Sequence, residues 1–152
     1  MRGMTLTGNK QLLACMLAMG GMLAVERTPG YCMKVVRQTE EYARGKPDGW
    51  VWTLFPPSTP RTATGAELAA LALGWGVPLA DAQPGDWVFN RNVSKPEGHV
   101  GRIVARNRAG TEWLVLENTT AARGVRLGGA LALTRLSVFG PVTAVIRLPE
   151  NL

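Results

Sequence analysis

The chain has 152 residues, the size of one domain, and 46% of them are hydrophobic against 18% charged, which is too apolar for a disordered protein. Two cysteines and one histidine are too few for a four-ligand zinc site of the Cys/His type or for a disulfide scaffold, and we expect no metal or other cofactor. The net charge is +6, and residues 91–152 hold nine basic against four acidic residues, which favours an anionic partner such as nucleic acid, a membrane surface or an acidic polymer.

The first apolar stretch runs from Leu12 to Val25 and is 14 residues long, whereas a membrane-spanning helix needs about 20. Glu26 and Arg27 follow it with no clear cleavage site, so the pattern does not indicate a secretory signal peptide. We therefore predict a buried helix from about Asn9 to Met19, with Cys15 as a packed thiol, and no insertion into a membrane.

Residues 31–45 have the pattern of an amphipathic helix. Gly45 is placed to end it, with Arg44 complementing the negative end of the helix. At its beginning, the helix dipole and free backbone N–H groups stabilise an anion and favour a reactive thiolate at Cys32. The positions on the inward face recur at helical spacing: Cys32, Val35, Val36, Thr39, Tyr42 and Ala43.

Residues 45–63 hold four prolines and two tryptophans, which predicts an ordered loop. Trp50 and Trp52 belong either to the core or to the lining of a substrate groove. Thr64-Gly65-Ala66-Glu67 matches a capping box and predicts a short helix to about Leu73. The helical part of the chain then extends from about residue 9 to residue 75.

From residue 86 to about residue 148 the pattern changes to strands. Pro84-Gly85-Asp86 predicts a turn before the first strand, and residues 107–110 predict a hairpin. Helices followed by strands are typical of an α+β domain, with helices packed on one side of an antiparallel sheet. We predict one such domain over residues 1–152, with about five strands: Trp87–Phe89, His99–Arg106, Thr111–Asn118, Ala130–Thr134 and Val142–Leu148.

Catalysis by a nucleophilic cysteine also needs a base and a group that orients the base. His99 is the only histidine, and glycines at 98 and 101 allow another segment to approach it closely. A loop at residues 107–110 pairs Arg106 with Thr111 and therefore His99 with Asn118, which points to the same face. Glu117 points to the other face unless a β-bulge changes the register. The strand pattern favours Asn118 as the orienting group and leaves Glu117 open.

The order of the cysteine, turn, histidine and polar motifs along the chain resembles that of the NlpC-type and CHAP (cysteine, histidine-dependent amidohydrolase/peptidase) branches of the papain-like hydrolases. The resemblance covers about residues 28–120. It implies a papain-like fold, Cys32 as the nucleophile, His99 as general base and acid, and Asn118 or Glu117 as the orienting group. It rests on four motifs: Gly30-Tyr31-Cys32, Pro84-Gly85-Asp86-Trp87-Val88-Phe89, Gly98-His99-Val100-Gly101 and Glu117-Asn118.

The resemblance implies a cofactor-free hydrolase of peptide or amide bonds in bacterial peptidoglycan. Tyr31 stands where many NlpC-type enzymes have Asp or Asn, so their substrate preference does not carry over. Tyr31, Trp50 and Trp52 are the candidate substrate-binding residues. Without a clear signal peptide, we expect a cytoplasmic protein until it is released or delivered to the wall, as a phage lysin, a virion component or a toxin of a secretion machine.

Two alternatives stay open. A cysteine peptidase or deamidase acting on a protein has the same sequence pattern, and a non-catalytic papain-like binding module has the same fold with an unreactive Cys32. Nucleic-acid binding is not expected, because the arginines of the second half are dispersed and no recognition motif is present.

Overall fold

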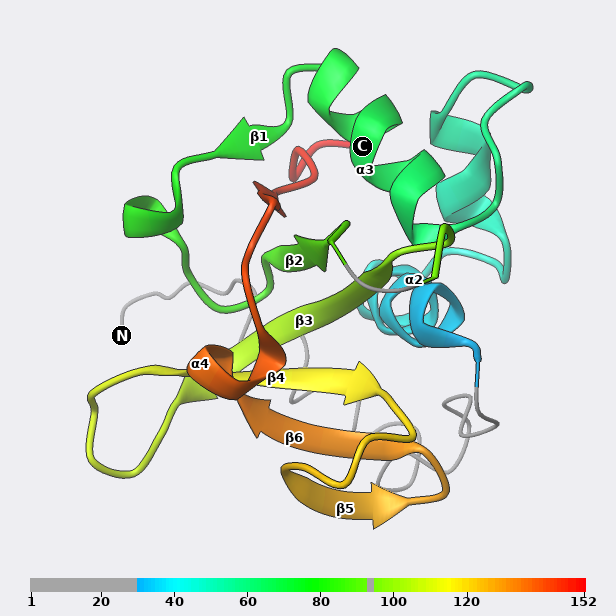
Figure 1. Ribbon diagram of the computed structural model, residues 1–152. Coiled ribbons are helices and arrows are strands. Elements are labelled where there is room, and N and C mark those ends of the chain that lie inside the picture. The colour runs from blue at the N-terminus through cyan, green and yellow to red at the C-terminus, as the bar shows by residue number, and fades with distance from the viewer. Residues whose placement is uncertain (1–29, 93–94) are drawn as a thin grey trace.

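The computed structural model, which describes residues 30–92 and 95–152, has an α+β architecture built on one antiparallel sheet (Figure 1). The strand order is β1-β7-β2-β3-β4-β6-β5. The α+β class is confirmed, but the expected five strands were two too few, because the edge strands β1 and β5 have only two and four residues, too few for a clear periodic pattern. The strands are β1 (Gly76–Val77), β2 (Trp87–Asn90), β3 (His99–Arg106), β4 (Trp113–Asn118), β5 (Val125–Gly128), β6 (Leu131–Arg135) and β7 (Ala144–Ile146).

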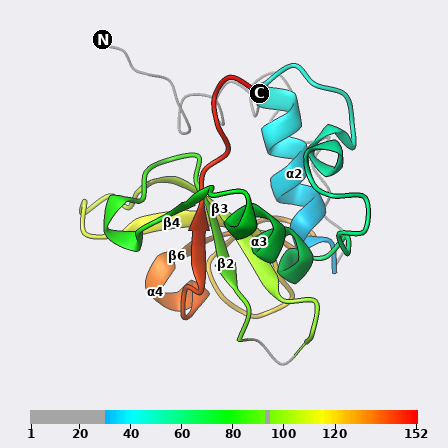
Figure 2. The ribbon, with the colours of Figure 1, turned by 90° about the horizontal axis from the view of Figure 1, so that it is seen from above.

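The helices lie on both sides of this sheet. Figure 2 shows α2 (Cys32–Ala43) and α3 (Ala63–Ala72) on one side and the short α4 (Leu136–Phe139) on the other. The prediction that helices pack on one side of the sheet therefore holds for α2 and α3 but not for α4. Two 3₁₀ turns, Trp50–Leu54 and Leu79–Asp81, lie in the connections. The helix expected at residues 9–19, with Cys15, lies outside the described residues. Within the described part of the chain, no helix has the length and apolar character needed to cross a membrane.

Helix α2 begins and ends as the sequence predicts. At its end the Gly45 N–H donates to the Tyr42 carbonyl and the Lys46 N–H to the Glu41 carbonyl, the two hydrogen bonds of a Schellman motif. Its buried positions differ from the predicted inward face: Tyr42 is exposed, whereas Met33, Arg37, Glu40 and Glu41 are buried. Glu40 accepts a hydrogen bond from the Trp87 indole and forms an ion pair with the buried Arg102. This polar contact joins α2 to strands β2 and β3.

Helix α3 begins one residue before the predicted capping box. Its N-cap is Thr62, whose side chain accepts a hydrogen bond from the Gly65 N–H at 3.0 Å, so the expectation that Thr64 caps the helix was wrong. Thr64 is occupied elsewhere: its N–H donates to the Glu97 carbonyl at 2.9 Å and its hydroxyl to the Pro96 carbonyl at 3.2 Å. Helix α3 therefore holds the segment that leads into β3 and His99.

The two faces of the sheet carry separate apolar clusters. Trp87, Phe89 and Val100 pack with α2 and α3, because alternate strand residues point to the same face. The residues between them, including Val88 and Ile103, pack on the other face with Phe139 of α4. Burying apolar surface on both faces fixes which side of the sheet each strand residue occupies.

The register between β3 and β4 contains a β-bulge. Ile103 pairs with Val115, whereas Ala105 pairs with Leu114, so Val104 is an extra residue on β3. The extra residue shifts the pairing by one position and exchanges the faces of all residues beyond it. As a result Glu117 lies opposite Gly101.

This register differs from the predicted one in two ways. Arg106 pairs with Trp113 instead of Thr111, because the hairpin loop is two residues longer than expected. A shift of two residues leaves every side chain on its predicted face. The one-residue bulge does not, and it moves Glu117 to the face of His99 and removes Asn118 from it.

Gly101 lies where no larger residue fits. A Cβ added there would be 2.3 Å from Val115 Cγ1 and 3.1 Å from Phe139 Cε1. We expect Gly101→Ala to lower the free energy of unfolding by about 1–3 kcal/mol, measured by chemical denaturation, because the strand and Phe139 must move apart.

Gly76→Ala is the matched control for this substitution. Its new Cβ would meet only the tip of Leu71, Cδ2 at 2.9 Å, and a flexible side chain can swing away. Equal losses of stability in the two variants would contradict the close packing around Gly101.

Candidate active site

Cys32 is the first residue of α2. Tyr31, the N-cap residue, makes no side-chain hydrogen bond to the first turn, so its side chain does not occupy the backbone N–H groups that could bind an anion. Cys32 is a free, half-buried thiol. The predicted position of this cysteine at a helix N-terminus is confirmed, and backbone N–H groups at such a terminus stabilise negative charge.

His99 is the first residue of β3, so its ring lies at the end of the sheet. Its Nε2 is 2.6 Å from Glu117 Oε1, and its ring stacks on Phe139 with the centroids 5.2 Å apart. Cys32 and His99 line the same hollow, and interaction with the Cys32 side chain raises the pKa of His99. With Nε2 directed to Glu117, Nδ1 is the ring nitrogen that remains for the thiol.

The environment of His99 favours its protonated form. Burial lowers the pKa of His99, but hydrogen bonds and charge interactions with Cys32 and Glu117 outweigh burial and raise the pKa from 6.5 to about 9. The imidazole is therefore a cation at neutral pH. A cation beside a thiol stabilises the thiolate, which is the nucleophilic form.

Glu117 is a fully buried carboxylate with two cationic partners. Arg123 Nε donates to its Oε2 at 3.0 Å and Arg123 Nη2 to its Oε1 at 2.7 Å, and His99 shares Oε1. Burial raises the pKa of Glu117, but the hydrogen bonds from His99 and Arg123 more than offset burial and lower the pKa below its ordinary value. The carboxylate therefore stays ionised beside the imidazole.

Asn118 was the favoured partner of His99, and the observed register overturns that preference. Asn118 is buried and pairs with Leu131 of β6, while the hydrogen bond of His99 goes to Glu117. The physical reason is the bulge at Val104, which gives Glu117 the face of His99. Asn118 still lines the hollow that Cys32 and His99 share.

Cys32 lies where two hollows of the surface meet. One, of about 360 Å³, is lined by His99 and Asn118; the other, of about 290 Å³, is lined by Tyr31 and Trp52. Both include Cys32 and Glu97 in their walls. An extended substrate can therefore occupy both sides of the thiol.

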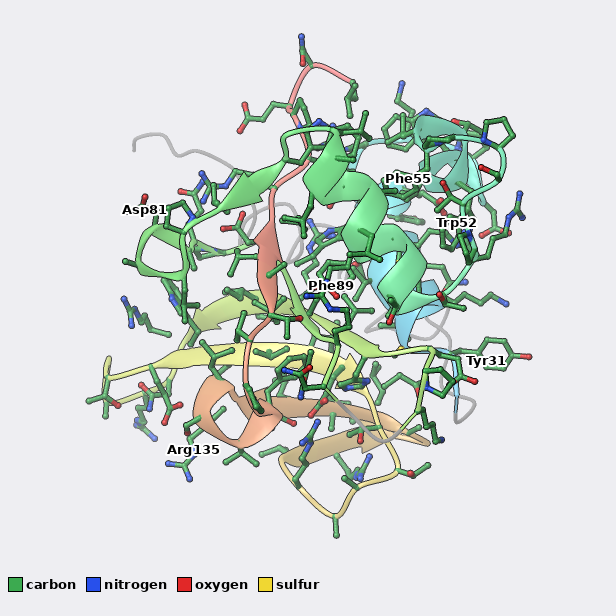
Figure 3. The ribbon with its side chains drawn as sticks, turned by 45° about the horizontal axis from the view of Figure 1, so that its top comes forward. Tyr31, Trp52, Phe55, Asp81, Phe89 and Arg135 are labelled. Carbon is green, nitrogen blue, oxygen red and sulfur yellow. The ribbon has the colours of Figure 1, made fainter. Side chains whose placement is uncertain are left out.

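The aromatic candidates separate into two groups. Tyr31 is half exposed and points outward at the beginning of α2, and Trp52 lies on the same side of the molecule (Figure 3). Both line the second hollow. Trp50 does not; its ring lies against Lys46, with Nζ 5.2 Å from the ring centroid, and packs on the helix-side core.

Two residues at this site are not indicated by the sequence. Arg123 comes from the irregular segment between β4 and β5, and its sequence context shows only a basic residue in a polar loop. Phe139 lies in α4, a helix too short for a periodic signal. No pattern in the sequence marks either residue as a neighbour of His99.

Among residues 30–92 and 95–152, no group of three or more His, Cys, Asp or Glu side chains is arranged to hold a metal ion. Comparisons with models of protein families, with curated proteins and with solved structures find no match for this chain. Its function must therefore be inferred from the chemistry of the side chains around Cys32.

Proposed function

We propose that this chain is a papain-like cysteine hydrolase of the NlpC-type and CHAP superfamily that cleaves peptide or amide bonds in bacterial peptidoglycan. The observation that carries the proposal is that His99 is hydrogen-bonded to the Glu117 carboxylate and lines the same hollow as the Cys32 thiol. A nucleophile at a helix N-terminus, a base beside it and an ionised group behind the base are the parts that nucleophilic acyl transfer requires.

In the first half of the reaction, the Cys32 thiolate attacks the carbonyl carbon of the scissile bond and a C–S bond forms. Backbone N–H groups at the beginning of α2 stabilise the oxyanion of this tetrahedral intermediate. The His99 imidazolium then donates its proton to the leaving nitrogen, the C–N bond breaks, and the amine departs. The acyl group remains on Cys32 as a thioester.

In the second half, water attacks the thioester carbonyl and neutral His99 takes its proton. The C–S bond breaks, the carboxylic acid product leaves, and the thiolate and imidazolium pair is restored. Glu117 stays ionised throughout. It holds the ring in place through Nε2 and stabilises the imidazolium.

Three features support a wall polymer as substrate. The two hollows that meet at Cys32 suit an extended chain, Trp52 offers an aromatic surface beside it, and the net charge of +6 favours retention on an anionic wall. We propose that the enzyme reaches the wall by release or delivery, as a phage lysin, a virion component or a secreted toxin.

Digestion of purified peptidoglycan tests this proposal. We expect the wild-type protein to release soluble fragments, with one new amine end and one new carboxyl end formed at each cleaved bond, identified by mass spectrometry. A digest with no new ends after prolonged incubation contradicts a wall substrate.

The same experiment separates the alternatives when a thiol-reactive electrophile is added. Rapid labelling of Cys32 without wall products favours a peptidase or deamidase with a protein substrate. Labelling no faster than that of an unperturbed thiol favours a non-catalytic binding module.

A further inference from the structure

Arg123 is attached to both groups that surround the His99 ring. Its Nε and Nη2 bind the two oxygens of Glu117, at 3.0 and 2.7 Å. Its Nη1 donates to the carbonyls of Val138 and Phe139, at 3.0 and 3.3 Å. One guanidinium group therefore links the acceptor of the histidine hydrogen bond to the residue on which the ring stacks.

The planar geometry of arginine matters for this arrangement. A bidentate contact fixes the rotation of the carboxylate about its last torsion, which a point charge does not. Glu117 Oε1 is shared between Arg123 and His99, so fixing that oxygen also fixes the direction of the hydrogen bond to the ring.

The fold brings Arg123 to this place through its neighbour Gly124. A Cβ at Gly124 would be 2.4 Å from the Leu133 carbonyl oxygen. The loop between β4 and β5 can therefore lie directly on β6 only with glycine here, and this close approach carries the Arg123 side chain over Glu117.

We propose that Arg123 is a positioning residue that fixes Glu117 and Phe139 on two sides of the His99 ring and so directs the imidazole toward Cys32. The inference rests on the proposed function, in which His99 must donate a proton to a leaving amine. Arg123 itself touches neither the thiol nor the substrate in this scheme.

The test uses the fact that His99 is the only histidine, so its NMR titration needs no assignment. Wild-type His99 should titrate with a pKa of about 9. By charge alone, removing the nearby Arg123 cation would raise the pKa of His99, because the imidazolium would no longer be repelled. Loss of the Glu117 orientation acts downward. If Arg123 positions Glu117, the loss of orientation outweighs the loss of charge, so we expect Arg123→Met to lower the pKa of His99 by about one unit or more. An unchanged or raised pKa overturns the proposal.

Arg126→Met is the matched control. Arg126 holds the same loop through the carbonyls of Thr119, Ala121 and Ala130, and none of its hydrogen bonds goes to Glu117. The control should leave the His99 titration unchanged. An equal shift in both variants would assign the effect to loop order and overturn a specific role of Arg123.

Arg123→Lys keeps the charge and loses the bidentate contact, so it tests the proposal even where the methionine variant does not fold. We expect its His99 pKa to fall, by less than in Arg123→Met, and its kcat to fall with little change in KM. A titration identical to that of wild type overturns the proposal. If wild-type protein releases no wall fragments but the titrations shift as expected, the positioning role stands and the proposed function fails. If wild-type protein releases wall fragments but the titrations do not shift, the proposed function stands and the positioning role fails.

Discussion

Cys32→Ala is expected to reduce kcat/KM on purified peptidoglycan by at least about 10⁴-fold, because the acyl-enzyme cannot form without the thiolate. The measurement is the initial rate of fragment release from walls, compared with wild type at the same protein concentration. The variant should remain folded, since Cys32 is half-buried at the beginning of α2 and a smaller side chain fits there.

Two further variants make this result specific. Cys15→Ala should keep wild-type activity, because no step of the proposed reaction uses Cys15. Cys32→Ser keeps the shape of the side chain but replaces the thiol by a far less acidic hydroxyl, and it should be as inactive as Cys32→Ala. Activity in Cys32→Ala equal to that of wild type would eliminate the cysteine mechanism.

Glu117→Gln has the second-largest expected effect, a fall in kcat/KM of about 10²–10⁴-fold at neutral pH. Glutamine fills the same space but carries no charge, so the pKa of His99 moves from about 9 toward its ordinary value of 6.5. The fraction of His99 that can protonate the leaving amine then decreases as the pH rises above 6.5. The alkaline limb of the pH profile of kcat/KM should therefore move to lower pH.

Asn118→Ala is the matched comparison, because Asn118 is the adjacent residue and the one that strand alternation favours. The hydrogen bond between His99 and Glu117 does not involve it, so we expect a loss of less than about 10-fold. A greater loss in Asn118→Ala than in Glu117→Gln would show that the orienting group is Asn118.

The sequence predicts the parts of the fold that are long and periodic. Helix α2 and the five predicted strands, which correspond to β2, β3, β4, β6 and β7, are recognisable from the spacing of their apolar residues. Helix α3 begins earlier than expected because Thr64 is held by the segment before His99, a contact between residues far apart in the chain. The edge strands β1 and β5 are held by pairing with β7 and β6 and are too short to be recognised from their spacing.

The residues of the site could be predicted from the sequence to different extents. Cys32 and His99 follow from the scarcity of such residues and from their places at the beginnings of a helix and a strand. Glu117 depends on one extra residue in β3, and local sequence does not state where a bulge lies. Arg123 reaches the site from an irregular loop, so only the folded chain places it beside Glu117.

The bulge at Val104 also decides which residue of β4 lies beside His99. If Val104 paired as an ordinary strand residue in a chain of the same length, Asn118 would lie opposite Gly101; with the bulge, Glu117 lies there. Because Val104 is the extra residue, its deletion would leave a regular ladder in which Gly101 still pairs with Glu117, and both side chains would keep their faces. The bulge therefore selects which of two adjacent polar side chains faces His99, without any change at position 117 or 118.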